Sequence, residues 1–152
     1  MIDIGSKAPD FTLADQDGNE HSPLQEGRPV VLFFYPKDDT SGCTKEACQF
    51  RDARSSYEQA GAAVYGISPQ GVDSKAKFAA KHDLNFPILA DDDAVVCEQY
   101  GVWQEKSMYG KKYMGVVRTT YLIGADGTVR ERWDKVKVDG HSDAVLEAVS
   151  SA

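Results

Sequence analysis

Two cysteines five positions apart, Cys43 and Cys48, carry the most reactive side chains of this 152-residue sequence. Cys43 follows a polar segment that separates an apolar run from residues favouring helix, and Thr40 or Ser41 can cap that helix. Cys43 is therefore expected in the first turn, where free backbone N–H groups and the helix dipole favour a thiolate. The thiolate is the nucleophilic form of cysteine, so the position predicts a reactive sulfur rather than an inert buried thiol.

The spacing of the two cysteines restricts what they can do together. Five residues along a helix rise about 7.5 Å and turn the side chains about 140° apart. A disulfide needs Cα atoms roughly 4.4–6.8 Å apart, so Cys43 and Cys48 cannot bond while the helix is intact. If they bond, the first turns must unwind, which favours a reaction intermediate over a permanent cross-link. The spacing also differs from the Cys-x-x-Cys of thiol–disulfide exchangers.

No metal site is expected. Structural zinc needs four ligands, usually arranged as two close pairs. The remaining candidate ligands sit singly in the sequence: Cys97, His21, His82 and His141. Cys97 lies on an apolar helical stretch and is interpreted as a buried, inert thiol, with an accessory redox role as the alternative. The acidic residues 91–93 are interpreted as helix N-terminal acids in a solvated loop.

The elements that must position these cysteines follow from hydrophobic patterning. Residues 29–35 form a continuous apolar run ending at Pro36, which predicts a strand buried on both faces, as in a parallel sheet. The turn signal at residues 17–18 predicts a small N-terminal hairpin. Residues 103–115 are expected to form a loop, with aromatic residues that could provide a docking patch. Helices are expected at 43–60, 72–82 and 142–149, and a further helix follows residues 91–93 and ends at residue 100. Strands are expected at 62–68, 86–89, 116–123 and 129–133.

This order predicts an α/β fold with a mixed central sheet flanked by helices, the thioredoxin-like layout. The length predicts one domain spanning residues 1–152. A net charge of −7 disfavours nucleic acid and anionic membrane surfaces as partners. No apolar run is long enough to span a bilayer, and the N-terminus has no secretory pattern. Three cysteines, an odd number, indicate a reducing compartment such as the cytoplasm.

The segment Pro36-x-x-x-Thr40-x-x-Cys43 resembles the active-site signature of the peroxiredoxins. The longer run from residue 34 to Cys48 is similar to the bacterioferritin comigratory protein (PrxQ) branch. Two distant segments, residues 5–13 and 118–123, also resemble the family. The branch usually has Pro at position 41, where this chain has Ser41. Proline there would stiffen the loop, so Ser41 can shift the balance between folded and unwound states in a direction the sequence does not fix.

The resemblance implies a thiol-dependent peroxidase that needs no bound cofactor or metal. Cys43 would be the peroxidatic residue and Cys48 the resolving residue, joined as a Cys43–Cys48 disulfide in the oxidised form. Thr40 and Arg118 would hold the thiolate and the peroxide, and Arg118 would stabilise charge as the O–O bond breaks. Pro36 would shield the sulfur from water. Glu46 matches a position often filled by Glu or Gln.

The implied partners are hydrogen peroxide or organic hydroperoxides and a thioredoxin-type dithiol reductant. The branch is commonly monomeric. Two alternatives remain at this point: a thiol–disulfide oxidoreductase without peroxidase activity, and a redox sensor in which the Cys43–Cys48 bond changes a surface. Faster reduction of insulin than of peroxide would favour the first alternative. Oxidation without turnover by any reductant would favour the second.

Overall fold

The computed structural model describes residues 1–151 and contains a five-stranded mixed sheet. The strand order is β5-β4-β3-β8-β9, in which β3, β4 and β5 run parallel and β8 and β9 run antiparallel to their neighbours. These strands are β3 (Val30–Phe34), β4 (Ala63–Ser68), β5 (Ile88–Ala90), β8 (Thr119–Ile123) and β9 (Val129–Trp133). Two smaller two-stranded sheets pair β1 (Leu13–Ala14) with β2 (Glu20–His21), and β6 (Trp103–Met108) with β7 (Lys111–Val116).

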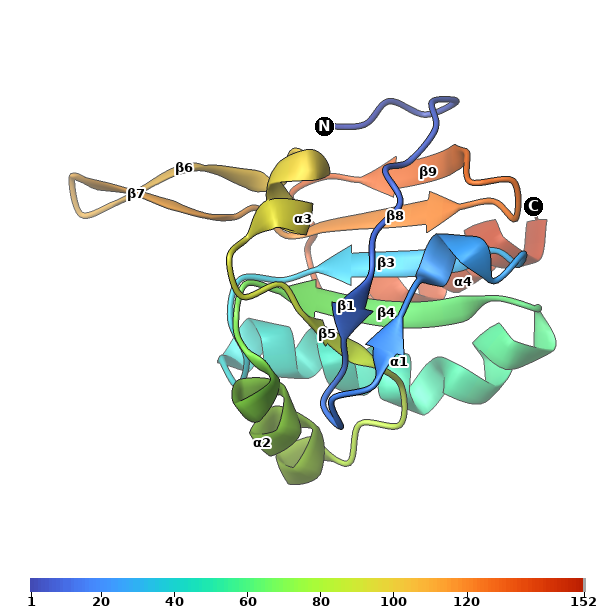
Figure 1. Cartoon of the computed structure of the whole chain (residues 1–152), viewed down its shortest axis with the longest axis horizontal. Helices are drawn as coiled ribbons and strands as arrows, with labels where there is room; N and C mark the ends of the chain where they lie inside the picture. Colours follow the sequence, from blue (N-terminus) through green and yellow to red (C-terminus); the bar gives the residue numbers. More distant parts are fainter. Residues whose placement is uncertain (152) are drawn as a thin grey trace.

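Four α-helices surround the sheet, as Figure 1 shows. They are α1 (Ser41–Gln59), α2 (Val72–His82), α3 (Val95–Gln99) and α4 (His141–Ser151), and a short 3₁₀ helix covers Pro23–Gln25. None of the helices within residues 1–151 is long and apolar enough to cross a membrane.

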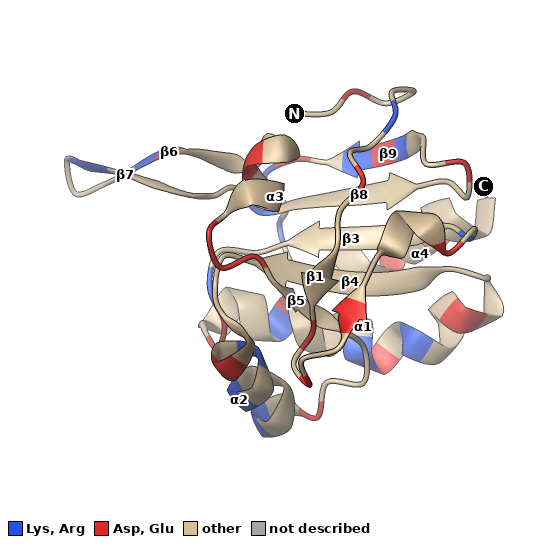
Figure 2. Cartoon of the chain, in the orientation of Figure 1, with Lys and Arg blue, Asp and Glu red and all other residues tan. Residues whose placement is uncertain are grey.

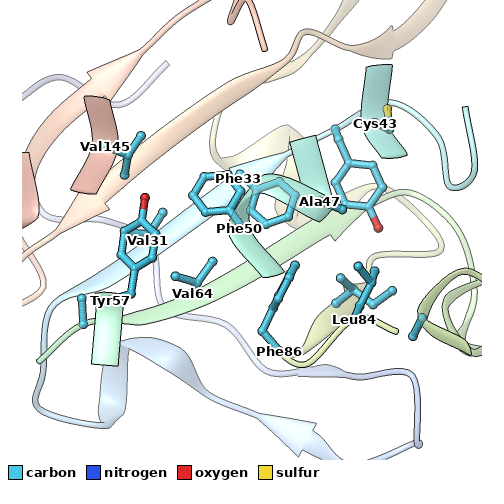
Figure 3. Packing of buried hydrophobic residues seen from close by; sticks show 14 of the residues in the cluster. Val31, Phe33, Cys43, Ala47, Phe50, Tyr57, Val64, Leu84, Phe86 and Val145 are labelled. Atoms are coloured by element: carbon cyan, nitrogen blue, oxygen red, sulfur yellow. The ribbon is translucent and has the colours of Figure 1, made fainter. Parts of the chain in front are cut away.

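The central strand β3 is buried along its whole length, because both faces of the sheet are covered. Its alternate residues Val31 and Phe33 belong to a core cluster with side chains of α1, α2 and α4. Figure 3 shows this cluster extending from Val145 of α4 to Cys43 of α1. The ring of Phe33 stacks on that of Phe50, with 4.6 Å between their centroids. The side chains of β3 on the other face pack against α3 and the N-terminal segment.

The predicted mixed sheet, the N-terminal hairpin and the helices at both faces are therefore present. The helix expected at 43–60 begins two residues earlier, and the helix expected at 72–82 has those bounds. The expected strands lie within a few residues of their predicted positions.

The prediction of a loop at residues 103–115 was wrong. These residues form most of the β6–β7 hairpin, which projects from the sheet as a two-stranded arm (Figure 1). Its turn consists of Tyr109 and Gly110, whose φ angles of 52° and 77° match the turn that joins short hairpins. Tyrosine rarely adopts positive φ, so Tyr109-Gly110 is a weaker hairpin signal than Asn-Gly or Asp-Gly. Figure 2 shows basic residues at the tip of this arm, where Lys111 and Lys112 are exposed. The apolar residues Met108 and Tyr109 are exposed there as well, and Tyr109 is 97% exposed.

Candidate active site

Cys43 lies where the central strand meets the longest helix. Strand β3 ends at Phe34, a loop covers residues 35–40, and α1 begins at Ser41. The predicted first-turn position of Cys43 is thus confirmed. The residue is 1% exposed, and it forms the end of the core cluster on that face of the sheet.

Arg118 reaches Cys43 because of the strand register. Thr119, the first residue of β8, pairs with Phe34, the last residue of β3. This pairing places the preceding residue, Arg118, beside the loop that leads to Cys43. Its Nη2 donates a hydrogen bond to Cys43 Sγ at 3.3 Å. Arg118 thus presents a cationic hydrogen-bond donor directly to the Cys43 sulfur.

Gly42 allows this approach. A Cβ atom added at Gly42 would lie 3.1 Å from Arg118 Nη2, which is closer than side chains normally pack. The guanidinium would have to shift to accommodate it. Gly42 stood in the sequence motif without an assigned role, and its role follows only from the position of Arg118.

Glu46 lies one turn after Cys43 on α1 and holds the other side of the guanidinium. Arg118 Nη1 donates to Glu46 Oε1 at 2.8 Å, while Glu46 Oε2 has no hydrogen-bond partner among residues 1–151. The side chain of Glu46 is fully buried. Burial raises the pKa of this carboxyl from 4.5 to about 7, against the opposing effect of Arg118. Burial likewise opposes the charge of Arg118, but Glu46 and Cys43 outweigh it and raise its pKa.

The raised pKa of Glu46 predicts a pH-dependent stability. The folded protein holds this proton more tightly than the unfolded chain, so stability is lost as the pH rises from about 4.5 to about 7. The free energy of unfolding of the wild type should fall by about 3 kcal/mol across this window. That of Glu46→Gln should not show this fall, because glutamine does not titrate. Urea unfolding of both proteins at several pH values measures the difference. Parallel stability curves for the two proteins would contradict the prediction.

Cys48 lies on the same helix as Cys43, and its side chain is partly exposed. Both are free thiols with α1 intact, in agreement with the helix geometry. Cys97 is also free and belongs to the core cluster on the opposite face of the sheet. Cys97 is buried, as predicted, and burial and the adjacent Asp91 carboxylate raise the pKa of its thiol, which disfavours the reactive thiolate.

Thr40 and Pro36 lie on the loop before α1. Thr40 occupies the N-cap position, but neither its side chain nor that of Ser41 makes a capping hydrogen bond, so the predicted side-chain cap was wrong. The Thr40 hydroxyl instead donates to the carbonyl oxygen of Lys37 at 3.0 Å. This bond tightens the loop just before Cys43. Pro36 is partly buried at the start of the same loop.

The other predicted features lie away from Cys43. No group of three or more potential metal ligands occurs within the described residues. Asp91 is buried rather than solvated: its carboxylate accepts the backbone N–H of Val96 and of Cys97 at the start of α3. Asp91 nevertheless lies at the N-terminus of a helix, as predicted.

The sequence matches the AhpC/TSA family over residues 4–132. The chain belongs to this family. It is 51% identical over 147 residues to the putative peroxiredoxin bcp of Coxiella burnetii, covering 95% of this chain and 97% of the relative. The structure of Xylella fastidiosa PrxQ superposes with a TM-score of 0.93 at 33% identity, covering 99% and 97% of the two chains. The Xanthomonas campestris bacterioferritin comigratory protein, solved in work on its alkyl peroxide reduction activity, gives a TM-score of 0.91 at 37% identity over 98% of each chain.

These matches place the chain on the Bcp/PrxQ branch of the peroxiredoxins and confirm the thioredoxin-like fold. This peroxiredoxin is therefore a thiol-dependent peroxidase. Its Cys43 combines a helix N-terminus with a guanidinium donor, which is what peroxide reduction by a thiolate requires.

Proposed function

We propose that this peroxiredoxin reduces hydrogen peroxide and alkyl hydroperoxides at Cys43 and resolves the product with Cys48. A thioredoxin-type dithiol protein then restores both thiols. The observation that carries the proposal is the hydrogen bond from Arg118 to Cys43 Sγ at the N-terminus of α1. The alkyl hydroperoxide class is supported by the peroxide-reducing relative from Xanthomonas campestris.

In the first step the Cys43 thiolate attacks one oxygen of the peroxide and the O–O bond breaks. The proton of the peroxide goes to the leaving oxygen, which departs as water or an alcohol, and Cys43 is left as a sulfenate that takes a proton from solvent to become the sulfenic acid. Negative charge moves from sulfur to the leaving oxygen during this step. The Arg118 guanidinium, held in place by Glu46, already faces the sulfur, so it stabilises this charge without rearranging.

The loop residues complete the pocket in this proposal. Pro36, partly buried beside the site, keeps water from the sulfur. Thr40 lies three residues before Cys43, and its hydroxyl oxygen keeps lone pairs free while its proton is bound to Lys37. In the proposed cycle, that oxygen accepts a hydrogen bond from the incoming peroxide.

In the second step the Cys48 thiol attacks the sulfenic sulfur of Cys43, and water leaves as the disulfide forms. Both cysteines lie on one helix, so the first turns of α1 must unwind before the sulfur atoms can meet. A dithiol donor then reduces the disulfide and becomes a disulfide itself. The cycle thus uses one peroxide and one dithiol in each turnover.

We propose that the chain works as a monomer in the cytoplasm. The hydrogen bonds that hold Cys43, Arg118 and Glu46 together are made within one chain, and a reducing compartment keeps the dithiol donor reduced. The net charge of −7 supports a cycle without nucleic acid or anionic membrane partners.

Stopped-flow oxidation of the fully reduced protein by one equivalent of hydrogen peroxide tests this cycle. We expect rapid oxidation, with free thiols falling from the three present to one, because Cys43 and Cys48 are consumed and Cys97 remains. The Cys43→Ser variant provides the baseline. Oxidation as slow as that of an unactivated thiol, with hydrogen peroxide and with an alkyl hydroperoxide, would contradict the proposed site.

A further inference from the structure

A buried ion pair fixes the loop that precedes Cys43. Asp38, in the middle of loop 35–40, pairs with Lys75 of α2, whose Nζ lies 3.0 Å from both carboxylate oxygens. The side chain of Lys75 is 0% exposed and that of Asp38 is 3% exposed. Buried ion pairs are rare because desolvating two charges costs several kcal/mol for each ion.

The remaining polar atoms of the pair are also satisfied. The Asp38 carboxylate accepts hydrogen bonds from hydroxyl groups, and the backbone N–H of Asp38 donates to Gln70 Oε1 at 2.5 Å. Lys75 also donates to Ser68 and lies 5.1 Å from the centroid of the Tyr35 ring, within cation–π distance. The hydroxyl donors to Asp38 are Tyr35 at 2.6 Å, Ser74 at 2.6 Å and Ser68 at 3.4 Å. Burial lowers the pKa of Lys75, and the Asp38 charge opposes that change.

The network joins three elements to one point of the loop. Ser68 ends β4, Lys75 and Ser74 belong to α2, and Tyr35 follows β3 directly. The next residue, Asp39, also pairs with α2, through Lys81 and His82, but these contacts are exposed. Only the Asp38 contact is therefore shielded from water, and only it is expected to restrain the loop strongly.

We propose that the Asp38–Lys75 pair is a positioning anchor that holds loop 35–40 in its folded arrangement and thereby opposes the unwinding of α1. This inference rests on the proposed cycle, in which Cys43 must leave the helix to meet Cys48. With Asp38 fixed five residues before Cys43, the loop keeps the N-terminus of α1 against Arg118. The anchor thus favours the folded site for peroxide attack and limits how often the helix opens for resolution.

Removal of Lys75 should change which reaction consumes the Cys43 sulfenic acid, disulfide formation or further oxidation. An unpaired Asp38 carboxylate in this buried site must either take up a proton or move toward water, and either change releases the loop from α2. The first turn of α1 would then open more often. Cys48 would capture the Cys43 sulfenic acid faster, and a second peroxide would compete less well. That competing reaction converts the sulfenic acid to a sulfinic acid and releases water or an alcohol.

The test measures the ratio of sulfinic acid to disulfide by intact mass, after reduced protein reacts with increasing hydrogen peroxide. In Lys75→Met we expect this ratio to fall about tenfold, which corresponds to a shift of about 1.4 kcal/mol in the opening equilibrium. The rate of the first oxidation should fall as well, because Arg118 meets the sulfur less often. Loss of thermal stability alone would not change this ratio.

Two further variants make the test specific. Lys81→Met removes the exposed lysine that pairs with the neighbouring Asp39 from the same helix, and its ratio should match that of the wild type. The double variant Asp38→Asn with Lys75→Met has no buried charge to expel, so its ratio should return toward the wild-type value. It is also the variant expected to fold if Lys75→Met does not.

An unchanged ratio of sulfinic acid to disulfide in Lys75→Met would contradict the proposed role of the Asp38–Lys75 pair. A ratio that falls equally in the single and double variants would also overturn it, because lost packing rather than the unpaired carboxylate would then be the cause. If Lys75→Met does not fold, Asp38→Asn with Lys75→Met is compared with Asp38→Asn alone, which leaves Lys75 unpaired and should show the lower ratio. Rapid oxidation and disulfide formation in the wild type test the proposed cycle separately from any of these results.

Discussion

Replacing Arg118 with Met is expected to slow the oxidation of Cys43 by hydrogen peroxide by a factor of about 10²–10³, the usual cost of losing one donor to a developing charge. The methionine fills similar space but donates no hydrogen bond to the sulfur or to the leaving oxygen. The bond from Nη2 to Cys43 Sγ at 3.3 Å is the contact that disappears. Stopped-flow measurement of the second-order rate constant gives the effect directly.

The same substitution removes the cation that faces Glu46. The buried carboxyl would then have no partner and would stay protonated at neutral pH, because burial alone favours its uncharged form. Two further variants, Arg118→Lys and Gly42→Ala, keep a positive charge at residue 118 but disturb its contact with Cys43. Arg118→Lys keeps a cation but lacks the planar fork that bonds Cys43 and Glu46 together, so it should recover only part of the rate.

Gly42→Ala perturbs the same contact from the other side, since its Cβ would press on Nη2. It should slow oxidation even though alanine favours helix over glycine. A rate for Arg118→Met within a factor of ten of the wild type would contradict the assigned role of the guanidinium.

Much of this site could be predicted from the sequence because local signals and chain topology agree. The apolar run at 29–35 marks β3, and the polar residues after it mark a loop at the end of a parallel strand. The helical residues that follow place Cys43 in a first turn. Arg118 was reached only through the family resemblance, because the β3–β8 register that brings it to Cys43 depends on contacts far apart in the chain.

Other features of the site depend on burial, which residue type alone does not reveal. Lysine is almost always exposed, so nothing in the sequence marked Lys75 as the partner of Asp38. The raised pKa of Glu46 likewise follows from its position between α1 and Arg118. The β6–β7 arm was missed because its turn uses a tyrosine at positive φ. Thr40 was expected to cap α1, but the loop offers its hydroxyl a nearer acceptor, the carbonyl of Lys37.

Replacing Cys48 with Ser is expected to leave the first oxidation close to the wild-type rate and to abolish turnover with a thioredoxin-type donor. The Cys48 side chain takes no part in the hydrogen bonds that hold Cys43 and Arg118, so peroxide attack should proceed normally. The sulfenic acid then has no thiol to attack it. It should stall, or go on to sulfinic acid as peroxide is raised. Intact mass of quenched samples and turnover coupled to the donor protein measure both outcomes.

Cys97→Ser is the matched control, because it removes the third thiol and should leave turnover unchanged. Cys97 cannot replace Cys48 without a large rearrangement, since it packs in the core cluster on the opposite face of the sheet from Cys43. Burial and Asp91 also keep its sulfur protonated. A Cys43–Cys97 disulfide in Cys48→Ser would make Cys97 the resolving residue. It would also show that the sheet, rather than only the first turns of α1, must open during each cycle.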